Sequence, residues 1–168
     1  MKKILSGFLA LTCLLGISAC ATDEESSFKE QEVTQEEKKS EYALNETADI
    51  DGVKYTLTAV ERNSGFSYNT PESGKEYVIV TVSIENGSED KIDYNSYNFK
   101  MLNSQGQEID NAFVVDLENQ LDSGELTPGG NITGRMCFEE PAGDSGLKLN
   151  LYTNIFNEEP NCTFVLGA

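Results

Sequence analysis

The 168-residue chain contains no histidine and no tryptophan, and it has few basic residues. The absence of histidine excludes Ser-His-Asp and Cys-His nucleophile systems, and also zinc, copper and non-haem iron sites that depend on imidazole ligands. Lysine and arginine together number 12 against 29 aspartates and glutamates, so the formal net charge is −17. Because such a surface repels the phosphate backbone, we expect no nucleic acid among its partners.

Motifs for nucleotide and calcium binding are missing as well. The chain has no GxGxxG sequence, no P-loop and no complete EF-hand loop. The segment Asp49-Ile50-Asp51-Gly52 starts like a calcium loop but lacks the later ligands, so we interpret it as a turn that enters a strand. We therefore expect no metal, no cofactor and no enzymatic activity.

The N-terminus has the organisation of an export signal. Lys2 and Lys3 precede an apolar stretch, residues 4–17, that is too short to span a bilayer. This stretch runs into Ile17-Ser18-Ala19-Cys20, which resembles a bacterial lipobox. The resemblance implies that residues 1–19 are removed and that Cys20 carries acyl chains such as palmitate, which anchor the protein at the extracytoplasmic face of the cell membrane. The alternative is an ordinary secretory signal with an incidental cysteine.

Residues 20–47 differ sharply from the signal that precedes them. They are polar and rich in acidic side chains, with almost no apolar residue to bury. Such a segment cannot offset the entropy lost on ordering, so we predict a disordered acidic tether that begins at the lipidated cysteine. A short helix over residues 30–42 is the alternative.

The segment Lys75–Asn86 is the longest run of β-branched residues in the chain. Its apolar residues alternate, with Val78, Val80, Val82 and Ile84 on one face. This period of two predicts a strand with one firmly buried face and one mixed face.

Further alternating segments follow the same pattern between turn residues. The predicted strands cover residues 53–60, 75–86, 94–102, 108–116, 133–139, 147–153 and 163–166. The rows expected to face the core include Val53, Tyr55, Leu57 and Ala59; Tyr97, Phe99 and Met101; Ile109, Phe113 and Val115; and Met136 and Phe138. The polar segment 117–125 is expected to contain a turn of helix.

These strands predict an all-β fold. Alternation favours antiparallel sheets with one face in the core, and about seven strands suggest an immunoglobulin-like antiparallel β-sandwich over residues 48–168. A small barrel is the alternative.

The order of these motifs resembles a known family. The segment 77–86 is followed by Phe99-Lys100-Met101-Leu102-Asn103-Ser104-Gln105-Gly106, then by Leu126-Thr127-Pro128-Gly129-Gly130, with Gly134, Phe138 and Pro141 beyond. This pattern is similar to the immunoglobulin-like domain of unknown function found in many bacterial lipoproteins, which is related in fold to a secreted mycobacterial immunoprotective antigen. The resemblance implies a fold and an extracytoplasmic location, and it transfers no catalytic residue.

Cys137 and Cys162 are the only cysteines in the predicted domain. In an exported protein such a pair is a candidate disulfide. However, if Met136 and Phe138 face inward then Cys137 faces outward, whereas Cys162 shares the inward face of Phe164. The sequence therefore leaves the pairing open, since disulfide geometry is strict.

The predicted loop 63–74 contains Phe66 and Tyr68 among Gly, Ser and Asn. Rigid aromatic rings among adaptable polar groups are typical of recognition loops, so this is a candidate binding loop. The alternative is that both rings only cover the end of the sandwich, and the same two interpretations apply to Tyr94 and Tyr97.

Three functional hypotheses remain. The first is a non-enzymatic binding or accessory module that is anchored to the membrane through Cys20 and contacts an envelope protein or polymer. The second is a ligand or calcium sensor partnered with a membrane protein, for which the acidic group Glu85, Glu89, Asp90 and Asp93 is a candidate unless it is only a solvated edge. The third is a hydrolase that uses paired carboxylates.

Overall fold

The computed structural model describes residues 39–154 and 156–167. The predicted signal peptide, the lipidation site Cys20 and most of the predicted tether lie outside the described residues. Within the described ranges no helix has the length and hydropathy needed to cross a membrane.

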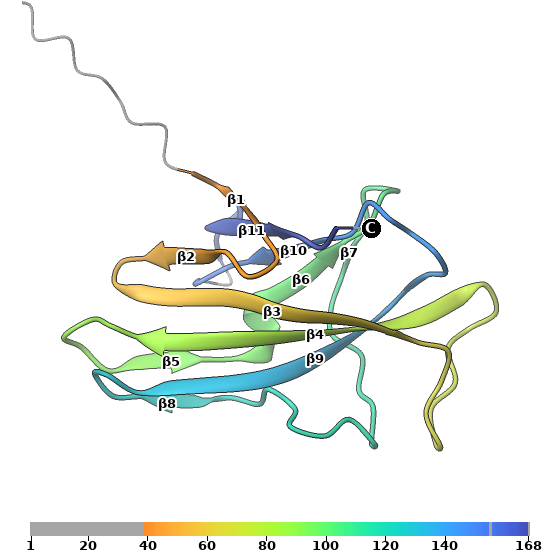
Figure 1. Ribbon diagram of the computed structural model, residues 1–168, viewed down its shortest axis with the longest axis horizontal. Coiled ribbons are helices and arrows are strands. Elements are labelled where there is room, and N and C mark those ends of the chain that lie inside the picture. The colour runs from red at the N-terminus through yellow and green to blue at the C-terminus, as the bar shows by residue number, and fades with distance from the viewer. Residues whose placement is uncertain (1–38, 155, 168) are drawn as a thin grey trace, which may run out of the picture. The chain divides into compact units, whose positions relative to one another are not determined.

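Two packed sheets and a short ribbon form the domain (Figure 1). The four-stranded sheet has the order β2-β3-β4-β9 and consists of β2 (Thr47–Ile50), β3 (Val53–Asn63), β4 (Lys75–Asn86) and β9 (Asn131–Pro141). The five-stranded sheet has the order β1-β11-β10-β6-β7 and consists of β1 (Glu41–Ala43), β11 (Cys162–Val165), β10 (Lys148–Leu151), β6 (Phe99–Leu102) and β7 (Glu108–Ile109). The ribbon pairs β5 (Ile92–Tyr94) with β8 (Gly124–Leu126).

The pairing is antiparallel throughout these sheets, with the exception of β1, which runs parallel to β11. The only helical element in the described ranges is a 3₁₀ turn, η1 (Ser96–Asn98), between β5 and β6. The prediction of an immunoglobulin-like β-sandwich is confirmed.

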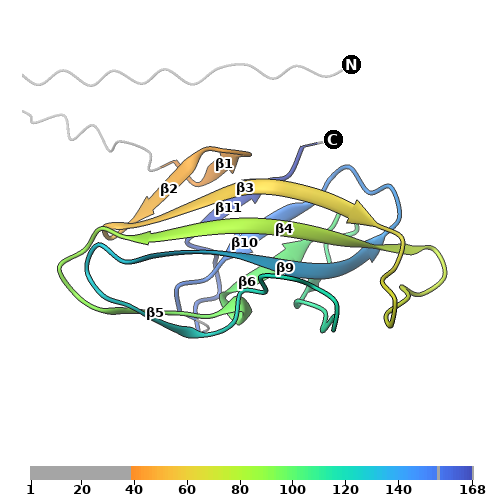
Figure 2. The same ribbon diagram turned by 60° about the horizontal axis from the view of Figure 1, so that its bottom comes forward.

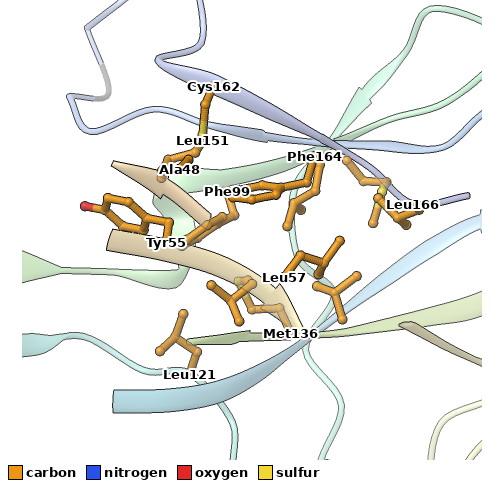
Figure 3. Close-up of a cluster of buried hydrophobic side chains, with 14 of the residues drawn as sticks. Ala48, Tyr55, Leu57, Phe99, Leu121, Met136, Leu151, Cys162, Phe164 and Leu166 are labelled. Atoms are coloured by element: carbon orange, nitrogen blue, oxygen red, sulfur yellow. The ribbon is translucent and has the colours of Figure 1, made fainter. Parts of the chain in front are cut away.

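The main core lies between the two sheets, and β4 is central to it. Val78, Val80, Val82 and Ile84 are buried there, as their spacing predicts. Figure 3 shows Phe99 and Phe164 from the five-stranded sheet pointing toward Leu57 of β3. Each strand offers alternate apolar residues to the same layer, so strands supply most of the core among the described residues.

A second, smaller cluster lies on the outer face of the four-stranded sheet. Tyr77, Ile79 and Cys137 point to this face and are covered by Val114 and Leu117. The covering segment 110–122 runs along β9, the edge strand of the sheet, and attaches to it through backbone hydrogen bonds, such as Leu121 N–H to the Arg135 carbonyl at 2.8 Å. Both faces of the sheet are therefore partly buried.

The predicted strand 108–116 is wrong beyond residue 109. β7 ends at Ile109, and the chain then leaves the five-stranded sheet to cover the second cluster. In this irregular segment Val114 is buried, while Phe113 and Val115 are exposed. The expected inward row is thus reversed, because alternation alone does not fix which set of residues faces the protein. The expected turn of helix over 117–125 is also wrong, since β8 occupies its end.

Two smaller expectations fail for local reasons. Tyr97 does not share the inward row of Phe99 and Met101, because it lies in η1, where the side chain of Asn95 accepts a hydrogen bond from the Tyr97 N–H. Ala59 is not fully buried, because a β-bulge between Leu57 and Ala59 shifts the register of β3 against β4.

The predicted boundary between tether and domain lies too late in the chain. Residues 41–43 form β1, which pairs with β11, and residue 47 begins β2. Tyr42 packs against Phe164 with ring centroids 5.9 Å apart. The sandwich therefore includes residues 41–47. The sequence places them in the tether because this segment is polar and too short to show a clear strand pattern.

The candidate disulfide between Cys137 and Cys162 does not form. Cys137 lies in the second cluster on the outer face of the sheet, whereas Cys162 lies in the main core near Leu151 and Ala48 (Figure 3). The two thiols are thus on opposite sides of the four-stranded sheet. This is the orientation conflict that the alternation of β9 predicts.

Candidate functional site

Two loops meet at one end of the second cluster. The loop 64–74 follows β3, and the covering segment 110–122 follows β7; both lie on the same side of the four-stranded sheet (Figures 1 and 2). Asn69 joins them, since its side-chain amide donates to the Phe113 carbonyl at 3.4 Å and its side-chain oxygen accepts from the Val115 N–H at 3.2 Å. One asparagine thus fixes the candidate binding loop against the covering segment.

The two aromatic residues of the candidate binding loop have different surroundings. Phe66 packs against Tyr77 with ring centroids 5.5 Å apart and belongs to the edge of the second cluster. Tyr68 projects into solvent with 80% of its surface exposed. The covering interpretation therefore holds for Phe66, and only Tyr68 is available for recognition.

Three further apolar or aromatic side chains are exposed, Phe113 and Val115 in the covering segment and Tyr97 in η1. Phe113 is 78% exposed, Val115 62% and Tyr97 63%. We call Tyr68, Tyr97, Phe113 and Val115 the aromatic surface. Large exposed apolar groups that gather on one end of a protein mark an interaction site more often than scattered ones do.

A hollow of about 330 Å³ lies between Tyr97 and Phe113. Its lining also includes Ser96, Asn111 and Leu121. The side-chain oxygen of Asn111 is buried and has no hydrogen-bond partner among the described residues, and the same is true of one carboxylate oxygen of Asp116. Only Asn111 of these two lines the hollow, and because a buried acceptor without a donor is costly, its oxygen favours a ligand that brings an N–H or O–H group.

The covering segment is acidic. Asp110, Asp116, Glu118 and Asp122 all lie within residues 110–122, and this range contains no lysine or arginine. Asp110 pairs with Lys100 at 3.5 Å, and the other three carboxylates leave Phe113 and Val115 in a segment of negative charge, which attracts cationic partners and repels anionic ones.

A groove of about 280 Å³ begins on the other side of Tyr97. Glu108 and Tyr152 line it, and the Glu108 carboxylate accepts hydrogen bonds from the Asn150 amide at 2.7 Å and from the Tyr152 hydroxyl at 2.6 Å. Burial, together with the neighbouring Glu108, raises the pKa of Tyr152 to about 12, so its hydroxyl remains a donor at neutral pH. The groove thus holds a fixed carboxylate beside two tyrosines.

The arrangement offers surfaces for binding and no cluster of metal ligands. Among residues 39–154 and 156–167, no three or more acidic or cysteine side chains come close enough to hold a metal ion. Of the acidic group considered as a calcium site, Glu85 pairs with Lys54 at 3.3 Å. This pairing is typical of a solvated edge.

The fold and these surfaces define a small β-sandwich of the type that bacterial lipoproteins carry. The chain belongs to the family described as a domain of unknown function (DUF4352), which matches residues 42–161. It is similar to the uncharacterized lipoprotein YjhA of Bacillus subtilis (strain 168), with 26% identity over an alignment 191 residues long, gaps included. The alignment covers 94% of this chain and 88% of the relative. This similarity agrees with the resemblance of residues 17–20 to a lipobox.

Solved structures show the same fold. The crystal structure of the yjhA protein from Bacillus subtilis has a TM-score of 0.61 at 24% identity and covers 74% of this chain and 99% of its own. The secreted protein MPT63 from Mycobacterium tuberculosis has a TM-score of 0.58 at 9% identity, covering 77% and 98%. The resemblance inferred from the sequence is thereby confirmed.

Sequence reasoning found Tyr68 and missed Phe113, Val115 and Asn111. It assigned Phe113 and Val115 to a buried row because they alternate with other residues. The available signal was the set of polar residues around them, Asp110, Asn111 and Asp116, which is unusual for a strand with a buried face.

Proposed function

We propose that this protein is a non-enzymatic binding module, anchored by lipid on Cys20 at the extracytoplasmic face of the cell membrane, that captures an envelope protein through the aromatic surface. The observation that carries the proposal is that Asn69 locks together the two loops that carry the exposed rings of Tyr68 and Phe113. Tyr97 of η1 lines the same hollow as Phe113. Rigid aromatic anchors supply most of the binding energy at protein interfaces, and a preorganised loop loses little entropy on binding.

The surroundings specify the chemistry of the partner. The covering segment carries four carboxylates, and among the described residues the buried side-chain oxygen of Asn111, which lines the hollow, has no donor. A partner segment that combines an apolar side chain with lysine or arginine fits both features. The apolar group would occupy the hollow between Tyr97 and Phe113, and the basic groups would face the acidic covering segment.

Site-specific photo-crosslinking in intact cells tests this proposal. A photoactivatable phenylalanine analogue replaces Phe113, Tyr97 or Tyr68 in the full chain, and the matched control carries it at Leu44, an exposed apolar residue in the β1–β2 turn. We expect one shared crosslinked protein from the first three positions and none from Leu44.

The charge requirement is tested in the same cells. Asp116→Asn combined with Asp122→Asn should reduce the yield of the crosslink at Phe113, whereas Glu85→Gln combined with Glu125→Gln, which removes the same charge elsewhere, should not. Absence of a crosslink at all three aromatic positions would contradict the proposal, as would an equal crosslink from Leu44.

The groove beside Tyr97 supports a second candidate function, a sensor of a small ligand. Its specific basis is the Glu108 carboxylate, which two hydrogen bonds hold in place beside Tyr152. Glu108→Gln in the full chain would then abolish a metabolite-dependent rise in the melting temperature that Asp122→Asn leaves intact. If no compound in a metabolite screen changes the melting temperature, this second function is excluded.

A further inference from the structure

A buried carboxylate, that of Glu140, lies near the C-terminal end of β9. Glu140 follows Met136 and Phe138 on the inward face of this strand and is fully buried. Carboxylates are rarely buried without a compensating partner, because removal from water penalises the charged form.

The partners of Glu140 are incomplete. One of its oxygens accepts a hydrogen bond from the Asn103 side-chain amide at 3.2 Å, and that amide also reaches Gln107. The other oxygen has no partner among the described residues. The neighbouring cation, Lys75, is held by Glu72 at 2.7 Å and lies 3.8 Å from Glu139, so its charge acts on Glu140 only at longer range.

A cavity of about 290 Å³ opens beside this carboxylate. Its polar lining combines three neutral amide side chains, those of Asn103, Gln105 and Gln107, with the charged side chains of Glu140, Glu139 and Lys75. Asn103 is fixed in place, since its side-chain oxygen accepts from the backbone N–H groups of Gln105 and Gln107 at 3.1 and 3.0 Å. The cavity is therefore a shaped polar site, and Glu140, which has one oxygen without a partner among the described residues, is part of its lining.

The donor set indicates the class of ligand. Divalent metal ions need several anionic or oxygen ligands, and no cluster of three acidic side chains exists among the described residues. One buried carboxylate surrounded by amide groups matches a single positive charge that carries several N–H donors. We propose that this cavity binds a primary ammonium group, with Glu140 as the counterion and the amide oxygens of its wall as further acceptors.

Ionisation of Glu140 couples this site to pH. Burial raises the pKa of Glu140 and Asp144 raises it further, while the Asn103 hydrogen bond and the charge of Lys75 lower it. Glu139 and Lys75 are the other titratable groups on the cavity wall. Because an ammonium ion favours the ionised carboxylate, its affinity should increase as pH rises through the Glu140 pKa.

Thermal unfolding of the full chain, purified in detergent, tests the proposal with ethylammonium as the probe. Tetramethylammonium at the same ionic strength is the control ion, because it has the same charge and no N–H donor. We expect ethylammonium to raise the melting temperature above that in tetramethylammonium, in a concentration-dependent manner that is larger at pH 7 than at pH 4.

Three variants locate the effect. Glu140→Gln keeps the shape of the side chain and should weaken ethylammonium binding about tenfold or more, which is the effect of losing a charge-assisted hydrogen bond. Glu85→Gln, which removes an exposed charge, should bind as the parent does, and Lys75→Gln should bind more tightly because it removes a competing cation. Equal melting temperatures in the two ions, or an ethylammonium effect that survives in Glu140→Gln, would overturn the proposal. Either result is independent of crosslinking at the aromatic surface.

Discussion

Asn86 is expected to contribute more to stability than any other side chain at its end of the sandwich. It ends β4 and is fully buried. Its side-chain amide donates to the carbonyls of Asp90 and Leu126 at 2.8 and 2.9 Å, and its side-chain oxygen accepts from the N–H and hydroxyl of Ser88 at 3.1 and 2.7 Å. One residue thus connects the turn after β4 to the end of β8.

The cost of Asn86→Ala follows from these four hydrogen bonds. The Ser88 hydroxyl also reaches the Asp90 carbonyl at 3.1 Å, so that carbonyl keeps a donor. The Leu126 carbonyl and the Ser88 N–H lose their side-chain partner, at about 1–3 kcal/mol each where water does not replace it. We expect a loss of about 3 kcal/mol in the free energy of unfolding, or about 10 °C in melting temperature for a domain of this size.

Urea unfolding followed by circular dichroism measures this loss. Asn131→Ala is the matched control, because Asn131 is exposed at the start of β9 and should change stability by no more than about 0.5 kcal/mol. Asn86→Asp should be at least as harmful as Asn86→Ala above the pKa of the new carboxyl, since it points a negative charge at two carbonyl oxygens. A loss below about 1 kcal/mol for Asn86→Ala would refute the assignment of Asn86 as the link between the turn after β4 and the end of β8.

Three further predictions follow from buried positions. Gly134→Ala would place a Cβ atom 2.8 Å from the Cα of Leu121, so we expect a loss of about 1–3 kcal/mol in urea unfolding; a neutral effect would show that the covering segment moves freely. Burial raises the pKa of Glu140, so the neutral carboxyl stabilises the fold at low pH, and this contribution is lost as pH rises through the folded-state pKa. The stability of Glu140→Gln should therefore match that of the parent near pH 4 and exceed it at pH 7. Burial also raises the pKa of Cys137 to about 12, so alkylation detected by mass spectrometry should occur only after unfolding and without prior reduction; rapid labelling of the native protein, or a need for reductant, would contradict this.

The sequence predicts a strand well where an unbroken row of alternate apolar residues distinguishes its buried face from its other face. β4 has a continuous valine row that fits only one core, and Met136 and Phe138 of β9 are buried as expected. The positions of these strands follow from the period of two, because a shift by one residue would expose the whole row.

The candidate site was harder to predict because long-range contacts decide it. The segment 110–116 alternates like a strand, yet its buried residue is Val114, since the second cluster offers a place for that side chain and none for Phe113. Similarly, β1 forms because the edge of β11 is available, although its own sequence favours a solvated tether. Local pattern does not contain this information.

The affinity of the crosslinked partner for variants of the aromatic surface tests the central claim most directly. The parent chain, Phe113→Ala and the control Leu44→Ala would be compared by titration of the purified partner. If Phe113 is a central anchor, its truncation should weaken binding at least about 30-fold, equivalent to about 2 kcal/mol, and Leu44→Ala should leave the dissociation constant unchanged. Equal dissociation constants for the parent chain and Phe113→Ala would show that binding, where it occurs, does not use the aromatic surface.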